Sequence, residues 1–180
     1  RSERSDSYKT YILKINENKE VRKSITFFAN YNKNIKFSFW FRQMASFRFD
    51  ILLEVRFRDL DALGHVNNAV YLTYFEIART HYWKNLFGLP AAQNWGFVMV
   101  RTECNYRSPA LLGETIKIST RILSIKNSSF TFEYRLIENQ TGRLIAEGLS
   151  IQACYDQKTG KTIQVSKEMR RKIQNFEGIK

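Results

Sequence analysis

The chain has 180 residues, 43% of them hydrophobic, which suffices for one domain with a sizeable core. Its two cysteines and two histidines are too few for a disulfide framework or a metal cluster, so we expect no cofactor, no metal and a reducing, cytoplasmic compartment. The net charge of +12 is unevenly spread, because residues 1–43 hold ten Lys/Arg against four Asp/Glu and thus half of the excess.

Residues 1–43 also differ in pattern from the rest of the chain. They are rich in Lys, Asn, Ile and Phe, have no sustained helical or strand period and begin without a methionine. We expect a disordered or non-native extension here, with a basic targeting peptide as the competing interpretation, and one working domain over 44–180. For that domain we expect no nucleic-acid partner and no membrane span, since no run of about 18 apolar residues occurs.

The working domain opens with an alternating segment, Phe47 to Arg58, that predicts a β-strand. A polar stretch follows and ends in Asn67 and Asn68, either of which is suited to cap a helix N-terminus. The helix is expected from about Ala69 to Phe87, because Gly88 favours a left-handed ending and a proline follows soon after. The side chains expected on one side of the strand are Phe49, Ile51, Leu53, Val55 and Phe57.

The expected helix is apolar around most of its circumference, which is typical of a helix buried on most sides. We therefore expect another element to cover it, and we expect His81 and Trp83 in the core or at an interface. One face holds Val70, Tyr74, Ile77, Ala78 and Tyr82, and the apolar surface extends over Leu72, Phe75, Trp83 and Leu86.

Four more strands are predicted: alternation indicates those at 115–125 and 130–136, and strand-like segments at 97–106 and 143–155 flank them. A short basic helix that Ser166 can cap follows. A strand, a long helix and four antiparallel strands predict an α+β fold, with an antiparallel sheet of about five strands wrapped around one long central helix. The residues expected to share a face of the sheet are Ile116, Ile118, Thr120, Ile122, Phe130, Phe132, Tyr134 and Leu136.

Short polar side chains are concentrated just ahead of the helix, in the stretch DLDALGHVNNAVYLTYFEIAR. The chain has no G-x-S-x-G elbow, phosphate-binding P-loop or G-x-G-x-x-G, so its chemistry would depend on carboxylates, amides and backbone dipoles. The pattern acid-x-acid, Gly-His-Val-Asn-Asn and Tyr-x-x-Tyr-Phe-Glu-x-Ala-Arg resembles the signature of the hotdog-fold acyl-CoA thioesterases, in the 4-hydroxybenzoyl-CoA thioesterase branch. The later stretches VRTECNYRSPALLGETIKI and SSFTFEY resemble the same family, so the resemblance covers about residues 47–172.

The resemblance implies a hotdog domain in which Asp61 is the catalytic carboxylate, as a nucleophile on the thioester carbonyl or as a general base on water. It also implies the backbone N–H of Asn68 as the donor to the carbonyl oxygen. His65 could orient water or the pantetheine amide, or simply bond to loop backbone. Glu76 occupies the place of the catalytic acid in some relatives of the fold, and could instead pair with Arg79.

The two acids before the helix are expected to differ in role. Asp61 has a second explanation, since an acid near a helix N-terminus can cap the loop there. Asp59 is expected to be structural and to share a strand face with Asp61. Alternatively, Asp59 could replace Asp61 as the base.

An acyl-CoA substrate carries three phosphates, so it requires cations near its nucleotide end. The candidates are Arg107, Lys126, Arg170 and Arg171, with Lys167 and Lys172 in the same basic tail; solvated surface charge is the alternative. By resemblance we also expect a homodimer or homotetramer, with sheets joined edge to edge.

The favoured function is hydrolysis of an acyl-CoA to a free acid and CoA. The nearest alternative is hydrolysis of acyl groups from acyl carrier protein, which the basic surface would also suit. From another class, the chain could be a non-catalytic acyl-CoA-binding module, or a basic interaction protein whose extension touches nucleic acid or anionic membrane.

Overall fold

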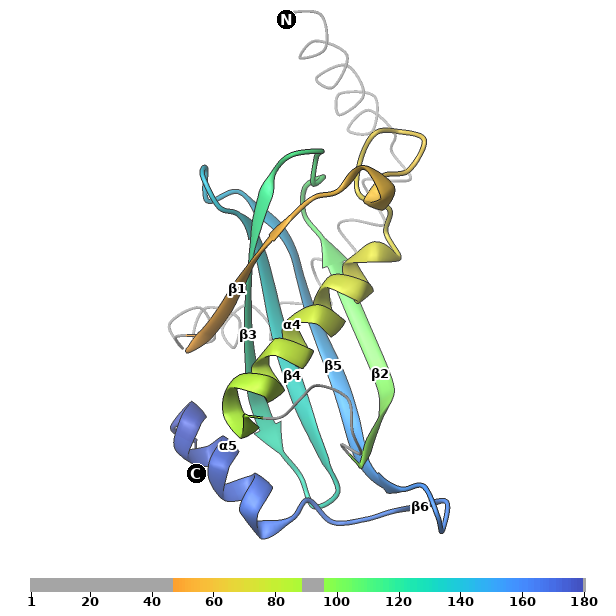
Figure 1. Cartoon of the computed structure of the whole chain (residues 1–180), viewed down its shortest axis with the longest axis vertical. Helices are drawn as coiled ribbons and strands as arrows, with labels where there is room; N and C mark the ends of the chain where they lie inside the picture. The colour runs from red at the N-terminus through yellow and green to blue at the C-terminus, as the bar shows by residue number, and fades with distance from the viewer. Residues whose placement is uncertain (1–46, 89–95, 180) are drawn as a thin grey trace, which may run out of the picture. The chain divides into compact units, whose positions relative to one another are not determined.

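The computed structural model of the chain describes residues 47–88 and 96–179 (Figure 1). The expected extension over 1–43 lies outside the described residues, so the domain boundary near Met44 stays a prediction. In chain order the elements are the strand β1 (Phe49–Glu54), the 3-10 helix η1 (Phe57–Asp59), the helix α4 (Val70–Phe87), the strands β2 (Phe97–Tyr106), β3 (Thr115–Ile125), β4 (Ser129–Glu138), β5 (Leu144–Asp156) and β6 (Lys161–Thr162), and the helix α5 (Lys167–Glu177).

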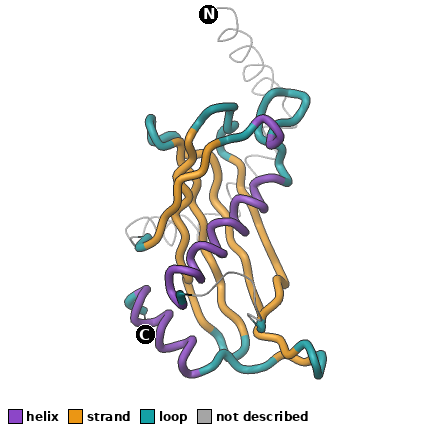
Figure 2. The backbone as a smooth tube through the Cα atoms, viewed as in Figure 1, coloured by secondary structure: helices purple, strands orange, loops and turns teal. Residues whose placement is uncertain are grey.

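One antiparallel sheet forms the body of this domain, and α4 lies across one of its faces (Figures 1 and 2). Five strands follow the order β1-β3-β4-β5-β2, and the short β6 pairs with the end of β5. This confirms the predicted α+β hotdog fold, to which β6 is an addition. β2 lies at an edge of the sheet and pairs with β5 alone among the described strands. In the described part of the chain, no helix has both the length and the apolar character needed to cross a membrane.

The core lies between α4 and the sheet face that it covers. All eight residues predicted to share a face of β3 and β4 are buried, which confirms the alternation in β4. In β3, Ser119 and Arg121, predicted on the other face, are buried as well. At the centre, the ring of Phe75 stacks on that of Tyr134, with centroids 4.3 Å apart. Gly148 of β5 makes room for this contact, because a Cβ added there would lie 2.5 Å from Phe75 Cζ and 2.6 Å from the carbonyl oxygen of Glu103.

The sheet covers only one side of α4, so the expected burial on most sides is wrong. Tyr71 is buried, whereas Leu72, which we expected to be covered, is 38% exposed. His81 is exposed and is not part of the core, while Trp83 is buried as expected. The helix ends as predicted, with Gly88 in the left-handed conformation (φ 65°). A helix that packs on a single layer keeps its other side toward solvent.

The first strand is shorter than predicted. β1 ends at Glu54 and the chain curls into η1, so Phe57 is 81% exposed instead of continuing the apolar side of the strand. The carboxylate of Asp59 accepts hydrogen bonds from the backbone N–H of Arg56 (3.1 Å) and from its guanidinium (2.9 and 3.0 Å). Such bonding of a side chain to nearby backbone competes with strand pairing and ends it here.

The tail helix α5 is attached at both ends. Ser166 Oγ accepts a hydrogen bond from Met169 N (3.1 Å), which confirms the predicted cap. Near the other end, Glu177 Oε1 accepts from the Tyr82 hydroxyl (2.6 Å) and from Ile122 N (2.8 Å), next to a β-bulge in β3. Burial raises the pKa of the Glu177 carboxyl above its ordinary value. These bonds connect α5 to both α4 and the sheet.

Candidate active site

The chain between η1 and α4 forms a tight loop. Asp61 N–H donates to the carbonyl of His65 (2.8 Å), and Gly64 N–H donates to the carbonyl of Asp61 (3.0 Å). Gly64 has a φ of 78°, a left-handed conformation that glycine adopts without steric cost. Val66 N–H donates to the carbonyl of Ala110 (3.0 Å), which fixes the loop against the segment between β2 and β3.

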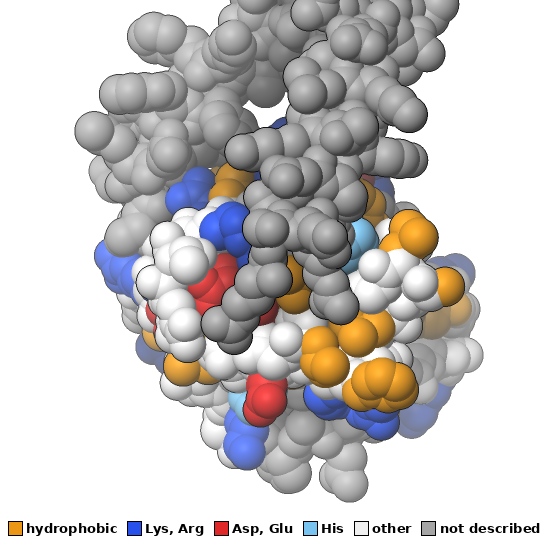
Figure 3. Space-filling model, turned by 90° about the horizontal axis from the view of Figure 1, so that it is seen from above, with side chains coloured by type: hydrophobic (Ala, Val, Ile, Leu, Met, Phe, Trp, Pro, Cys, Tyr) orange, Lys and Arg blue, Asp and Glu red, His pale blue; other side chains and the backbone are white. Residues whose placement is uncertain are grey.

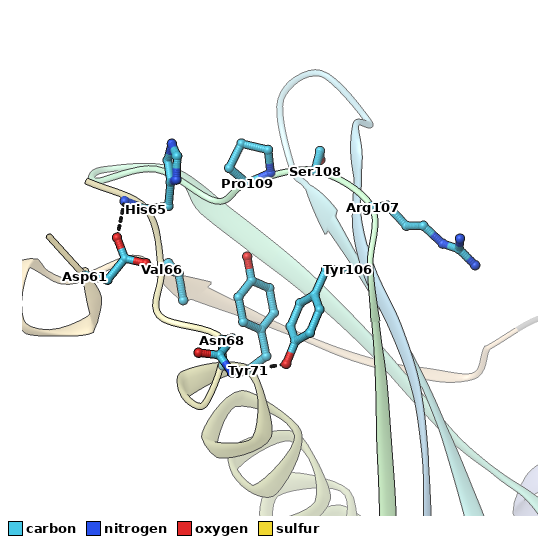
Figure 4. Close-up of a pocket in the computed structure, with 9 residues that line it drawn as sticks. All are labelled: Asp61, His65, Val66, Asn68, Tyr71, Tyr106, Arg107, Ser108 and Pro109. Carbon is cyan, nitrogen blue, oxygen red and sulfur yellow. Dashed lines mark hydrogen bonds between the residues drawn. The ribbon is translucent and has the colours of Figure 1, made fainter. Parts of the chain in front are cut away.

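A cavity of about 330 Å³ opens beside this loop, between the start of α4 and the end of β2 (Figure 4). The structure brings together four of the predicted site residues around it: Asp61, His65, Asn68 and Arg107. A carboxylate, the start of a helix and two phenol rings therefore share one space. The full lining is Asp61, His65, Val66, Asn68, Tyr71, Tyr106, Arg107, Ser108 and Pro109.

Asp61 is half-buried, and its two carboxylate oxygens differ in their contacts. Oδ1 accepts a hydrogen bond from Leu63 N (2.8 Å) and a long one from His65 N (3.4 Å). Among the described residues none donates to Oδ2, and in Figure 4 this oxygen points to the side on which the tyrosine rings lie. The first oxygen therefore caps the loop, as one explanation expected, while the second is open to the cavity.

The turn before α4 differs in detail from the predicted cap. The N-cap residue is Ala69, which makes no side-chain cap, so neither asparagine caps the helix as predicted. Asn67 Oδ1 instead accepts from Ala69 N (2.9 Å), and Val70 N donates to the carbonyl of Asn67 (2.9 Å), which winds the chain tightly one turn earlier. The N–H of Asn68 finds no acceptor in residues 47–88 and 96–179. It has the unpaired character of a first-turn amide.

His65 is half-buried at the edge of the cavity (Figure 4). Its main chain contacts Asp61 through both N–H and carbonyl, and it forms an isolated bridge with Leu111. These contacts fix the main chain of His65 beside Asp61, while in Figure 4 its ring points away from the carboxylate. The two roles predicted for the His65 side chain, orienting a ligand and bonding to loop backbone, both stay predictions.

Asp59 is 3% exposed, and its contacts are those of a structural residue. Besides the bonds from Arg56, its carboxylate accepts one from the hydroxyl of Tyr74 (2.9 Å). It does not share a strand face with Asp61, because the strand has already ended. Burial by itself raises the pKa of the Asp59 carboxyl, but the bonds from Arg56 and Tyr74 outweigh it and hold that pKa below its ordinary value.

We expect Asp59→Asn to lower the free energy of unfolding at neutral pH by roughly 2 kcal/mol, since hydrogen bonds to a charged group are lost. In the wild type this contribution is complete above the unfolded-state pKa of about 3.9 and disappears as the pH falls through the lower folded-state pKa. Urea unfolding at a series of pH values should therefore show the two proteins converging in acid. A difference that stays constant down to low pH would contradict the assignment. Asp50→Asn, at an exposed position on β1, is the control.

Glu76 lies on the exposed side of α4 and does not line the cavity. The expected pairing with Arg79 is wrong: the Arg79 guanidinium donates to the hydroxyl of Tyr134 (3.2 Å), which is hydrogen-bonded to Ser150 (2.7 Å). Arg79 therefore reaches toward the sheet, whereas Glu76 faces away from it. A hydroxyl inside the domain competes successfully with a solvent-screened pair on the helix surface.

The candidate cations fall into two separate places. Arg107 borders the cavity, and its guanidinium makes a long contact with Glu147 (3.4 Å). Lys126 follows β3 at the opposite end of the sheet, and its carbonyl accepts a hydrogen bond from the guanidinium of Arg170 (2.6 Å). Arg171 lies on the same helix α5, away from Asp61. In the parts of the chain that the structure describes, no group of three His, Cys, Asp or Glu residues could hold a metal ion.

Two aromatic residues of the cavity were not predicted as site residues. Tyr71 is buried in the first turn of α4, and Tyr106 ends β2. Their rings meet edge to face, with centroids 5.1 Å apart and planes at 78°. Both lie within stretches that carry the family resemblance, which is the signal that could have identified them. The periodic pattern of apolar residues could not have identified them, because both fit it as ordinary helix and strand residues.

Comparison with known proteins agrees with this arrangement. A family model described as the thioesterase-like superfamily matches residues 55–173. The chain is 32% identical over 129 residues to the long-chain acyl-CoA thioesterase FadM of Escherichia coli, an alignment that covers 69% of this chain and 96% of that protein. It is 29% identical over 126 residues to the acyl-CoA thioesterase YbgC of Haemophilus influenzae, covering 68% and 91%. A thioesterase of Thermus thermophilus, solved with coenzyme A and zinc, is 34% identical with a TM-score of 0.68, covering 76% of this chain and 100% of that one.

Proposed function

Because the chain belongs to the thioesterase-like superfamily, we propose that it hydrolyses an acyl-CoA thioester to a carboxylic acid and CoA, with Asp61 as nucleophile or general base. One observation carries this proposal: Asp61, with one carboxylate oxygen open, and Asn68, whose N–H finds no acceptor among the described residues, line the same cavity. Thioester hydrolysis needs a base or nucleophile on one side of the carbonyl carbon and a donor at its oxygen.

Two routes are open to the carboxylate. As a nucleophile, Asp61 Oδ2 attacks the thioester carbon, the C–S bond breaks, and CoA leaves as a thiolate that takes up a proton. Water then hydrolyses the mixed anhydride and restores the carboxylate. As a general base, the same oxygen takes a proton from a water molecule that attacks the carbonyl carbon directly; the C–S bond then breaks, and CoA leaves as a thiolate that takes up a proton while the carboxylate is restored. The bonds from Leu63 and His65 to Oδ1 hold the side chain in one orientation for either route.

Asn68 supplies the electrostatic part of the proposal. Attack on the carbonyl carbon places negative charge on the carbonyl oxygen, and the N–H of Asn68 is a donor that needs no reorganisation to receive it. The hydrogen bond from Val70 N to the carbonyl of Asn67 lies in the same peptide unit and polarises that N–H further. Loss of one such donor typically raises a barrier by about 3 kcal/mol.

The surroundings of the cavity suit an amphipathic substrate. Figure 3, which views this end of the domain, shows hydrophobic side chains gathered on one side of it. Two of the exposed hydrophobic residues, Leu63 and Leu111, lie in the loops that border the cavity. In this proposal the acyl group lies against apolar side chains, and Arg107 approaches a phosphate of CoA. Lys126, Arg170 and Arg171 would contact CoA only if another subunit carried them to a site.

We also propose a homodimer or homotetramer joined through β2. This edge strand exposes Val98, Met99 and Val100 by 40, 40 and 58%, and unpaired strand edges favour association with another strand. Sedimentation equilibrium should give a mass of two or four times 21.3 kDa. A monomer at micromolar concentration would reject this part of the proposal and leave the reaction to be tested separately.

The activity is tested by giving the purified protein a panel of aliphatic and aromatic acyl-CoAs and measuring free thiol. We expect release of CoA from at least one member, and equimolar free acid. A parallel panel of acyl carrier protein thioesters would separate the nearest alternative. Tight binding of acyl-CoA without any thiol release would instead favour a binding module and reject the proposed hydrolysis.

A further inference from the structure

Tyr106 connects the edge of the sheet to the start of α4. Its hydroxyl donates a hydrogen bond to the carbonyl of Asn68 (2.9 Å), drawn as a dashed line in Figure 4. The two residues are 38 positions apart in the chain, and Tyr106 is held by pairing of β2 with β5. Burial raises the pKa of Tyr106 above its ordinary value, so its hydroxyl remains a donor at neutral pH.

The carbonyl of Asn68 is free to accept this bond because the helix starts tightly. In a regular α-helix it would accept from Leu72 N, four residues later. Here Leu72 N donates instead to the carbonyl of Ala69 (3.1 Å). Within the described residues, Tyr106 is therefore the partner that satisfies this carbonyl.

Both sides of Asn68 are thus held by separate contacts. On the N-terminal side, the preceding peptide is bound through the carbonyl of Asn67, which accepts from Val70 N (2.9 Å). On the C-terminal side, the following peptide is bound through Ala69 N to Asn67 Oδ1 (2.9 Å) and through the Asn68 carbonyl to Tyr106. Asn67 N–H also donates to the carbonyl of Asp59 (2.9 Å), which attaches the start of the turn to η1. The bond from Tyr106 is the one that ties the Asn68 carbonyl itself to the edge strand β2.

We propose that Tyr106 is a positioning residue for thioester hydrolysis: its hydroxyl, bound to the Asn68 carbonyl, keeps the Asn68 N–H directed at the substrate carbonyl oxygen. This inference rests on the proposed function. Donors at an oxyanion site work because they are already aligned, and small errors in alignment have large effects on rate. The edge-to-face contact with Tyr71 holds the ring of Tyr106 in place and is independent of the hydroxyl.

The direct test is Tyr106→Phe, which removes the hydroxyl and keeps the ring against Tyr71. We expect kcat to fall about 10-fold and KM to rise by a smaller, several-fold factor, because alignment of the donor matters most when charge develops in the transition state. Tyr155→Phe is the matched control: it removes one phenolic hydroxyl from β5 at the opposite end of the sheet. Its kcat should equal that of the wild type.

A pair of inhibitors separates positioning from general damage to the site. One is a ketone analogue of an acyl-CoA hydrolysed by the wild type, with CH₂ in place of sulfur, which keeps the carbonyl. The other is the S-alkyl thioether of the same length, which lacks it. Tyr106→Phe should weaken binding of the ketone several-fold and leave binding of the thioether unchanged. Equal weakening of both would mean that the hydroxyl only shapes the site, and the inference would be wrong.

Failure of this inference can be told apart from failure of the proposed function. If the wild type hydrolyses acyl-CoA and Tyr106→Phe keeps its full kcat and ketone affinity, the role of Tyr106 is rejected and the hydrolysis stands. If the wild type releases no thiol from any acyl-CoA, the proposed function itself fails. Thermal unfolding of the variant, with binding of the thioether, verifies that the site is folded.

Discussion

Asp61→Asn is expected to reduce kcat for acyl-CoA hydrolysis by about 1,000-fold, within the range by which a general base accelerates a reaction and less than a lost nucleophile can cost. The amide keeps the shape of the carboxylate, and its Oδ1 can still accept the bonds from Leu63 and His65. Loop capping should therefore survive while the base or nucleophile is lost. Thiol release at saturating substrate measures the effect.

The matched control for this substitution is Asp156→Asn. Asp156 Oδ1 accepts from Lys158 N (2.9 Å), two residues later, in the same pattern as Asp61 Oδ1 and Leu63 N (2.8 Å). It lies at the end of β5, away from the cavity. We expect wild-type kcat from this variant. Near wild-type activity in Asp61→Asn would show that capping is the whole role of Asp61, and the mechanism would be wrong even though the fold is right.

Gly148→Ala is expected to give the largest loss of stability, about 3 kcal/mol, as overpacking of a filled core does. The added methyl group would lie 2.5 Å from Phe75 Cζ and 2.6 Å from the carbonyl oxygen of Glu103. The second contact is with backbone of the neighbouring strand β2, which cannot move without disturbing its pairing with β5. The ring of Phe75 cannot retreat easily either, because it is stacked on Tyr134.

Gly142→Ala separates this steric effect from ordinary glycine replacement. Gly142 has a φ of 71° and nothing within 4 Å of an added Cβ, so its replacement strains only the backbone, at a cost of about 1 kcal/mol. Urea unfolding of both variants gives the comparison. If Gly148→Ala lowered the free energy of unfolding no more than Gly142→Ala does, the packing of α4 on the sheet would be less tight than in the structure.

Local patterns in the sequence determined most of the secondary structure. Alternation placed β4 nearly correctly because this strand has one side toward α4 and one away, and a period of two records that difference. Gly88 and Ser166 marked helix ends correctly because capping depends on a few neighbouring residues. Alternation failed where side-chain hydrogen bonds or the packing of whole elements intervened. β1 ends early beside the bonds from Arg56 and Tyr74 to Asp59, and Leu72 is exposed because, among the described residues, the sheet covers the other side of the helix.

The candidate site divides in the same way. The sequence by itself determined which short stretch carries it: a family resemblance assigned roles to Asp61, His65 and Asn68, and they do meet at one cavity. Only the tertiary structure decided what surrounds them, since strand pairing brings Tyr106 to the carbonyl of Asn68 and leaves Lys126 at the far end of the sheet. Periodicity reports which side of an element is apolar. It contains no information on which elements become neighbours, because that depends on packing between segments far apart in the chain.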